Sequence, residues 1–313
     1  MALSVGAGRI VRVDGFEAIA ASAVPLTGGY GGETFAVSAA GEDAVLKLYA
    51  KRPGRAAVDA ALLRLVRGLL PVPRVLDAQV DQVDGNPTYV LTERLPGVNL
   101  EIFLVDADDR QRERIGEQLG ELLVRLSGMP FLTFGEFVGS GLAIESFGGD
   151  GLDEWLDRHV EALGLSRDQV ENLRDVVAEA GDLTDSGVHR FCLVHSDFNP
   201  KNLLVDPATA TVTGLIDWEF AHSGSPYGDL GNLLRFGGDP VLERAVLRVV
   251  RETGPDLGDR LVDRGRAADL WALIDLAART GQNPVATAAH GLITRMADTG
   301  ELSAGRPDPD VVH

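Results

Sequence analysis

The chain has 313 residues and a formal net charge of -18. This length allows one large domain or two lobes, and the composition is that of a soluble globular protein. The acidic balance argues against nucleic acid or an anionic membrane as a partner and favours a cationic ligand, although acidic surfaces also simply keep proteins soluble.

Cysteine usage and hydropathy bear on where the protein works. The single cysteine, Cys192, lies inside an apolar run and has no second cysteine for an internal disulfide, which favours a reducing compartment. The sequence contains no basic segment followed by an unbroken apolar run and no stretch of 18 uncharged apolar residues. We therefore expect a cytoplasmic protein without a signal peptide or membrane span.

The first patterned segment predicts two strands around a glycine-rich turn. Apolar runs at residues 24–26 and 34–38 flank the sequence LTGGYGGETF, whose backbone can turn tightly enough to lie over phosphates. The glycines of this turn are Gly28, Gly29, Gly31 and Gly32. Any hairpin can carry such glycines, so the turn alone does not establish a phosphate site.

Lysine is rare, and one lysine has an unusual position. Basic residues are almost all arginine, and Lys47, Lys51 and Lys201 are the exceptions. Lys47 lies within the predicted strand 44–49, where a lone lysine would normally face solvent. A chain that otherwise prefers arginine but keeps this lysine suggests a site that requires a compact ammonium group.

The turn at Pro96 and Gly97 separates two kinds of pattern. Strand-like runs, the last at residues 88–95, precede it together with one helix at 56–66, and long amphipathic helices follow it. We therefore predict a smaller lobe at 1–95 and a larger one at 96–313. Later helices are expected at 109–126, in two segments within 152–181, and at 240–252 and 264–280, whereas the Gly- and Phe-rich segment 129–151 is predicted to be a loop. Helical spacing favours surface positions for Asp269 and Asp275.

The stretch 191–236 places polar residues for chemistry. The apolar run 192–194 predicts a buried strand, and four polar residues fall in the loop that leaves it. These residues are His195, Asp197, Asn199 and Asn202.

A hairpin pattern follows this loop. Apolar runs at 203–205 and 211–216 are separated by a turn signal and end at Asp217. Folding the hairpin about its centre brings Asn202 opposite Asp217, so that an amide oxygen and a carboxylate face one point.

This arrangement suits Mg²⁺, which takes one or two protein oxygens and completes its octahedron with water and substrate phosphates. Asp197 remains available to accept a proton from an attacking hydroxyl. Asp and Asn also cluster in turns for local hydrogen bonds, but the complete set, with this spacing, favours phosphoryl transfer.

The motifs HSDFNPKNLL, LIDWEFA and GDLGNLL resemble the catalytic signature of the aminoglycoside phosphotransferase and choline kinase-like family. The resemblance implies Asp197 as catalytic base and Asn202 and Asp217 as metal ligands. It also implies structural support from His195, which holds the loop in shape, and from Asp229.

The same resemblance implies a protein-kinase-like α+β fold with a small antiparallel-sheet N-lobe and a larger, mainly helical C-lobe. Lys47 and the four glycines would contact nucleotide phosphates, and the backbone at Glu93 to Leu95 would hydrogen-bond a purine. Asp59 stands where the family pairs this lysine with Glu, and Ser196 stands where the family more often has Gly. The implied cofactors are ATP or GTP, between which the sequence does not choose, and Mg²⁺.

The resemblance implies transfer of the ATP γ-phosphate to a hydroxyl of a small molecule. DWE replaces DFG and no APE motif follows, which argues against an ordinary protein kinase. The acidic balance favours a cationic antibiotic, an aminoglycoside or basic peptide, as acceptor, and hence a resistance enzyme. Macrolides, choline, ethanolamine, homoserine and sugars remain open as acceptors. A non-catalytic nucleotide-binding module, suggested by Asp59 in place of Glu, is the alternative, and the sequence indicates no oligomeric state.

Overall fold

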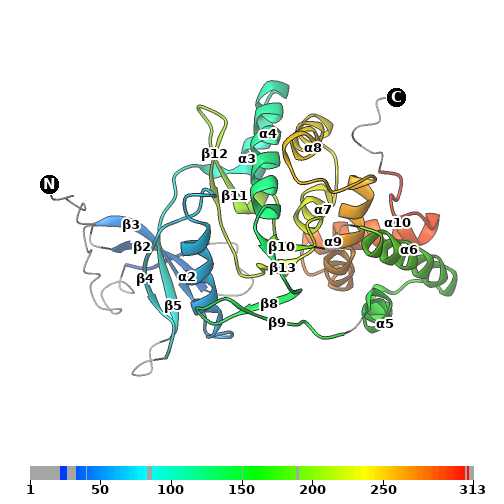
Figure 1. Ribbon diagram of the computed structural model, residues 1–313, viewed down its shortest axis with the longest axis horizontal. Coiled ribbons are helices and arrows are strands. Elements are labelled where there is room, and N and C mark those ends of the chain that lie inside the picture. The colour runs from blue at the N-terminus through cyan, green and yellow to red at the C-terminus, as the bar shows by residue number, and fades with distance from the viewer. Residues whose placement is uncertain are drawn as a thin grey trace. The chain divides into compact units, whose positions relative to one another are not determined.

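The computed structural model describes residues 22–26, 33–39, 41–82, 87–149, 151–187, 190–306 and 309. The chain divides into two compact units (Figure 1). Unit 1 comprises Met1–Leu95 and Val138–Ala143, and unit 2 comprises Pro96–Phe137 and Ile144–His313.

Unit 1 is built on an antiparallel five-stranded sheet with the order β1-β2-β3-β5-β4. Its strands are β1 (Val24–Pro25), β2 (Glu33–Ala39), β3 (Glu42–Leu48), β4 (Val75–Gln79) and β5 (Tyr89–Glu93). Side chains alternate between the faces of β3 because the period of a strand is two. Ala44 and Leu46 pack into an apolar cluster with Leu91, whereas Tyr49, just past the strand, packs against Ala56 and Ala60 of helix α2 (Arg55–Val66).

Unit 2 contains two further antiparallel sheets. The strand order is β12-β11-β6 in one and β7-β10-β13-β8-β9 in the other. Their strands are β6 (Val98–Asn99), β7 (Pro130–Phe131), β8 (Gly135–Val138), β9 (Ala143–Glu145), β10 (Phe191–Val194), β11 (Leu203–Asp206), β12 (Thr211–Leu215) and β13 (His222–Gly224). No strand was predicted in segment 129–151, and the structure has three short ones there. Its strands are too short, and its glycines too frequent, to give a periodic signal.

Helices make up most of unit 2. They are α3 (Leu100–Asp106), α4 (Asp109–Ser127), α5 (Leu152–Leu163), α6 (Arg167–Asp185), α7 (Gly228–Leu234), α8 (Pro240–Thr253), α9 (Leu261–Ala278) and α10 (Pro284–Thr299), with the 3-10 turn η1 (Pro200–Asn202). Helix α4 begins with a capping box in which Asp108 accepts from the Gln111 backbone. Within the described residues, no helix combines the length and apolar character needed to cross a bilayer.

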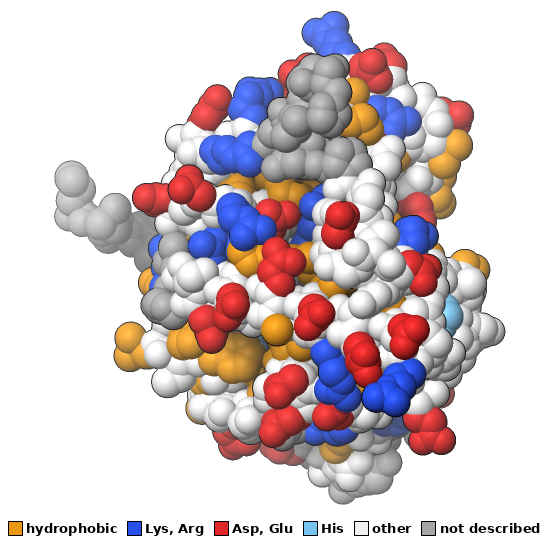
Figure 2. Space-filling model, turned by 90° about the vertical axis from the view of Figure 1, so that its right-hand side faces the viewer, with side chains coloured by type: hydrophobic (Ala, Val, Ile, Leu, Met, Phe, Trp, Pro, Cys, Tyr) orange, Lys and Arg blue, Asp and Glu red, His pale blue; other side chains and the backbone are white. Residues whose placement is uncertain are grey.

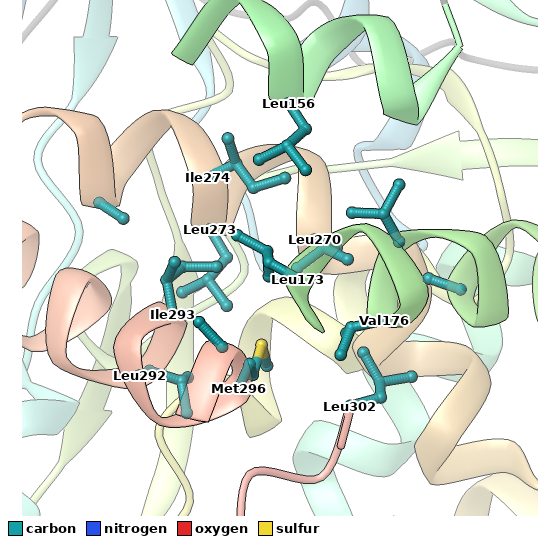
Figure 3. Packing of buried hydrophobic residues seen from close by; sticks show 14 of the residues in the cluster. Leu156, Leu173, Val176, Leu270, Leu273, Ile274, Leu292, Ile293, Met296 and Leu302 are labelled. Atoms are coloured by element: carbon teal, nitrogen blue, oxygen red, sulfur yellow. The ribbon is translucent and has the colours of Figure 1, made fainter. Parts of the chain in front are cut away.

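A large apolar core of unit 2 lies between helices α5, α6, α9 and α10 (Figure 3). Leu156, Leu173, Leu270 and Ile293 point toward one another from these four helices and are fully buried. Full burial of such side chains contributes about 1.5–3 kcal/mol each, so this cluster stabilises the packing of the four helices. The antiparallel-sheet part and the mainly helical part that the sequence predicts are therefore both present.

Candidate active site

Strand β10 delivers the chain into the polar loop. Cys192, Leu193 and Val194 are buried, and β10 pairs antiparallel with β13 and with β7 on its other edge. The strand ends at Val194, and the next residue, His195, is also completely buried. The loop therefore begins from a fixed point inside unit 2.

His195 connects this loop to the β11–β12 hairpin. Its Nε2 lies 3.0 Å from the Ile216 carbonyl oxygen, and its Nδ1 lies 3.3 Å from the Asp197 backbone nitrogen. Both contacts are satisfied by the neutral tautomer with its proton on Nε2, which donates to Ile216 while Nδ1 accepts from the Asp197 N–H. His195 thus fixes the backbone at Asp197 and the peptide that precedes Asp217.

Asp229, in the first turn of α7, holds the start of the loop. Its two carboxylate oxygens accept from the backbone N–H groups of His195 and Ser196, each at 2.8 Å. Burial raises the pKa of Asp229 to about 7, although these two hydrogen bonds oppose the shift. Ser196 has a φ of 67°, in the left-handed region where glycine is favoured. The position at which the family more often has Gly is therefore one whose backbone conformation suits Gly.

The carboxylate of Asp197 is held between two side-chain amides. Asn202 Nδ2 donates to Asp197 Oδ2 at 2.6 Å and to the Asp197 carbonyl oxygen at 2.9 Å. Asn199 Nδ2 donates to the other carboxylate oxygen, Oδ1, at 2.6 Å. Asp197 is therefore oriented on both sides by residues of its own loop.

The hairpin brings Asn202 and Asp217 near one another, with an offset of one residue from the prediction. Leu203 pairs with Leu215, and the Ile216 N–H donates to the Asn202 carbonyl at 2.9 Å, so Ile216 lies opposite Asn202. Near the turn the pairing differs from the prediction by two residues, and a register shift between Leu204 and Val205 reduces this difference to one, because the bulge adds a residue to β12. Asp217 follows with a φ of 64°, which turns the chain sharply out of the strand.

In unit 1, Lys47 lies near a buried polar cluster on the α2 face of the sheet. Its Nζ lies 5.7 Å from the centroid of the Tyr49 ring, within cation–π range. The Tyr49 hydroxyl donates to Asp59 Oδ2 at 2.6 Å, and Arg55 Nε donates to Asp59 Oδ1 at 2.7 Å. The structure therefore brings Asp59 to Arg55 and Tyr49, and Tyr49 lies between Asp59 and Lys47.

The predicted purine-binding segment continues from β5. The Glu93 N–H donates to the Arg74 carbonyl at 2.9 Å, and the Arg94 N–H donates to the Asp43 carbonyl at 3.2 Å. The Glu93 carboxylate accepts from the Arg74 backbone at 2.8 Å. Within the described residues, the Leu95 N–H makes no such backbone bond, so it is the candidate donor to a base. The predicted phosphate-binding glycines, Gly28, Gly29, Gly31 and Gly32, lie outside the described residues.

Two contacts were not predicted: one made by Asn199, which the sequence analysis named without giving it a role, and one made by Asp269. Asn199 contacts the Asp197 carboxylate, and its position just before Pro200 is a signal for a capping residue that could have indicated a fixed side chain. Asp269 was expected on the surface, but it is buried in a two-bond ion pair with Arg235, at 2.6 and 2.7 Å. Helical spacing alone gave no signal for that pair.

Comparison with known proteins places these features in a family. A sequence model of the phosphotransferase enzyme family matches residues 22–287. Among curated proteins, an aminoglycoside 3'-phosphotransferase of Streptomyces fradiae is 29% identical over 183 residues, which cover 55% of this chain and 63% of that protein. The mouse protein named acyl-CoA dehydrogenase family member 10 is 27% identical over 169 residues, 51% of this chain. That match spans only 15% of the mouse protein's length.

Solved structures show the same fold. A thermostable mutant of aminoglycoside phosphotransferase APH(4)-Ia, crystallised as a ternary complex with AMP-PNP and hygromycin B, superposes with a TM-score of 0.64. The two chains are 21% identical, and the match covers 92% of this chain and 97% of that chain. The two-lobed kinase-like α+β fold predicted from the sequence is confirmed. With a family match over residues 22–287, this chain belongs to the phosphotransferase enzyme family.

Proposed function

We propose that this protein transfers the γ-phosphate of ATP to a hydroxyl group of a small molecule. The observation that carries the proposal is the Asp197 carboxylate, held by two amides in the loop that leads to a hairpin whose backbone brings Asn202 and Asp217 near one another. In the proposed step, Asp197 accepts the proton of the acceptor hydroxyl as the oxygen bonds to the γ-phosphorus. The bond from the γ-phosphorus to its bridging oxygen breaks, and ADP leaves with that electron pair.

The residues present fit a magnesium ion. Asn202 uses its amide nitrogen on two oxygens of Asp197, which directs its amide oxygen away from that residue. Together with the Asp217 carboxylate it offers two hard oxygen donors, and Mg²⁺ typically takes the rest from phosphates and water. Within the described part of the chain, no group of three or more His, Cys, Asp or Glu residues could hold a metal. When bound, the ion would neutralise charge on the transferring phosphate.

Nucleotide binding is proposed for residues 1–95 and catalysis and acceptor binding for residues 96–313. Lys47 would contact the phosphates together with the glycine-rich turn, and the Leu95 N–H would donate to the base. Glu93, bonded to Arg74, would hold that segment in place. The AMP-PNP bound by the related structure supports a nucleoside triphosphate of this kind, ATP or GTP.

A cationic acceptor, such as an aminoglycoside or a basic peptide antibiotic, is the proposed substrate class, which makes resistance the proposed role. Support comes from the net charge of -18 and from the hygromycin B bound by the related enzyme. On the face shown in Figure 2, acidic and basic side chains are intermingled rather than separated by sign. A cationic acceptor would therefore be attracted by the net negative charge of the whole protein, and its affinity should fall as salt is added.

The test is an ADP-release assay with ATP and Mg²⁺ against aminoglycosides, basic peptides, macrolides, choline, ethanolamine, homoserine and sugars. Asp197→Asn should lower turnover about 100-fold or more, because it removes the proton acceptor, while AMP-PNP affinity stays unchanged. Asp206→Asn is the matched control, since Asp206 caps the β11–β12 turn, where Asn serves equally. Near-normal turnover of Asp197→Asn would remove Asp197 from the mechanism. Nucleotide binding without ADP release on any acceptor would favour a non-catalytic module.

A further inference from the structure

Asn199 lies two residues after Asp197 and uses both ends of its side-chain amide. Its Oδ1 accepts from the Lys201 N–H at 3.1 Å, which caps the 3-10 turn η1, and its Nδ2 donates to Asp197 Oδ1 at 2.6 Å. Between the two residues, Phe198 is completely buried and anchors the loop. The contact between Asn199 and Asp197 is therefore built on a fixed backbone.

The second Asp197 oxygen is held separately. Asn202 Nδ2 donates to Asp197 Oδ2 at 2.6 Å, so each carboxylate oxygen receives one amide donor. The terminal torsion of an aspartate is broad, and one donor would leave the carboxylate free to rotate about that contact. Two donors on opposite oxygens fix its plane. Each oxygen keeps a second lone pair, with which it can accept the hydrogen of an incoming hydroxyl.

Capping alone does not account for asparagine at this position. Asp, Ser and Asn cap a helical turn about equally well through a side-chain oxygen. Only Asn among them also supplies an N–H, since Asp would place a second carboxylate against Asp197 and Ser is too short to reach it. The identity of residue 199 is therefore explained by its contact with Asp197.

We propose that Asn199 is a positioning residue which, together with Asn202, orients the Asp197 carboxylate for proton abstraction from the acceptor. This inference rests on the proposed function. Its physical basis is that a base must meet the hydroxyl in one geometry, and that small misplacements of reacting groups cost large factors in rate. Asn199 acts on the acceptor side of the reaction through Asp197, and nucleotide affinity should not depend on it.

The test compares Asn199→Ser and Asn199→Asp, both of which keep the cap and lose the amide donor. Turnover and the KM for ATP are measured with the acceptor selected by the assay above and, for comparison, with water as acceptor. Asn199→Ser should lower kcat roughly tenfold or more with KM for ATP within about twofold, and Asn199→Asp should lower kcat further by repulsion. Asn283→Ser is the control, because Asn283 caps α10 by accepting from the Ala286 N–H at 2.8 Å.

The outcomes separate the possible roles. A fall in kcat with a melting temperature like that of the Asn283→Ser control supports positioning. Unchanged kcat in both Asn199 variants overturns the inference, as does a loss explained by a lowered melting temperature or a raised KM for ATP. Absence of transfer by the unmodified protein is a different result, seen before any variant is made, and it overturns the proposed function together with this inference.

Discussion

Replacing Gly231 with alanine should destabilise the protein strongly, because α7 and α9 cross there at backbone contact. A Cβ atom at Gly231 would lie 2.0 Å from the Gly265 carbonyl oxygen and 2.9 Å from the Asp269 Cβ. Reaching even 3.0 Å, the shortest approach that real Cβ atoms show, requires the helices to separate by about 1 Å, since 3.0 minus 2.0 is 1.0. Both obstructing groups are held by helix α9, so neither can rotate away.

The expected cost follows from this clash. Overpacking of a close-packed interior costs about 1–3 kcal/mol, and separation of the helices would also strain the buried Arg235–Asp269 ion pair. The better helix propensity of alanine returns up to about 1 kcal/mol. The 2.0 Å approach places the overpacking cost at the upper end of its range, so we expect a net loss of about 2 kcal/mol, which lowers the melting temperature by roughly 4–8 °C for a unit of this size.

The matched control is the facing residue, Gly265. A Cβ there would lie 3.3 Å from the Gly231 nitrogen and 3.4 Å from its Cα, so a small shift accommodates it. Gly265→Ala should therefore stay within about 1 kcal/mol of the unmodified protein, helped by helix propensity. Thermal unfolding followed by tryptophan fluorescence compares the two variants. Equal melting temperatures would refute the reasoning, because they would show that α7 and α9 do not cross at backbone contact.

Three further predictions concern the catalytic loop and the strand before it. Ser196→Gly removes left-handed backbone strain of about 1 kcal/mol or more but adds entropy to the unfolded chain, so the melting temperature should rise slightly. Ala210→Gly is the control, because Ala210 is also left-handed but lies away from the loop, and it should behave in the same way. A clear fall in the melting temperature of Ser196→Gly would contradict the prediction. The pKa of Asp229 is raised to about 7, so its contribution to stability is full below about pH 4, the ordinary pKa of Asp, and is lost as the pH rises from there to about 7, at up to about 1.4 kcal/mol per pH unit. Unfolding measured at pH 5 and pH 8 should show this dependence in the native protein and a flatter one in Asp229→Asn. Burial raises the pKa of Cys192 to about 12, so a thiol reagent at pH 8 should label it only on unfolding, and rapid native labelling would contradict its burial.

The polar loop at residues 195–202 could be located from the sequence because its polar residues are close together along the chain. The β11–β12 hairpin was also predictable, since a turn signal separates two apolar runs, but the bulge that shifts Asn202 to face Ile216 has no signature in residue types. Asp59 was placed by helical register alone. Helical register shows which face of α2 Asp59 occupies, but it does not show which side chains bond to its carboxylate. In the structure, these are Arg55 and Tyr49.

Long-range packing could not be predicted from local pattern. Asp269 lies on a helix whose charged residues look like a solvated face, and its burial depends on Arg235, 34 positions earlier in the chain. Helix α10 was not predicted, although it begins with a capping asparagine, Asn283, and a proline in its first turn, which are typical of a helix start. The elements that its apolar face packs against, α6 and α9, cannot be identified from the sequence of α10 alone.

The geometry of the proposed catalytic loop is imposed from outside the loop. Ser196 and Asp217 both adopt left-handed backbone conformations, which side chains of this kind disfavour, and such strain persists only where the surroundings over-determine it. Here the close crossing at Gly231 fixes α7, and α7 carries Asp229 to the backbone of Ser196. From the other side, His195 holds the Ile216 carbonyl just before Asp217. Ser196, which precedes the proposed base, and Asp217, a proposed metal ligand, are thus held by contacts from separate elements, so a change at the helix crossing should reach the proposed site through Asp229.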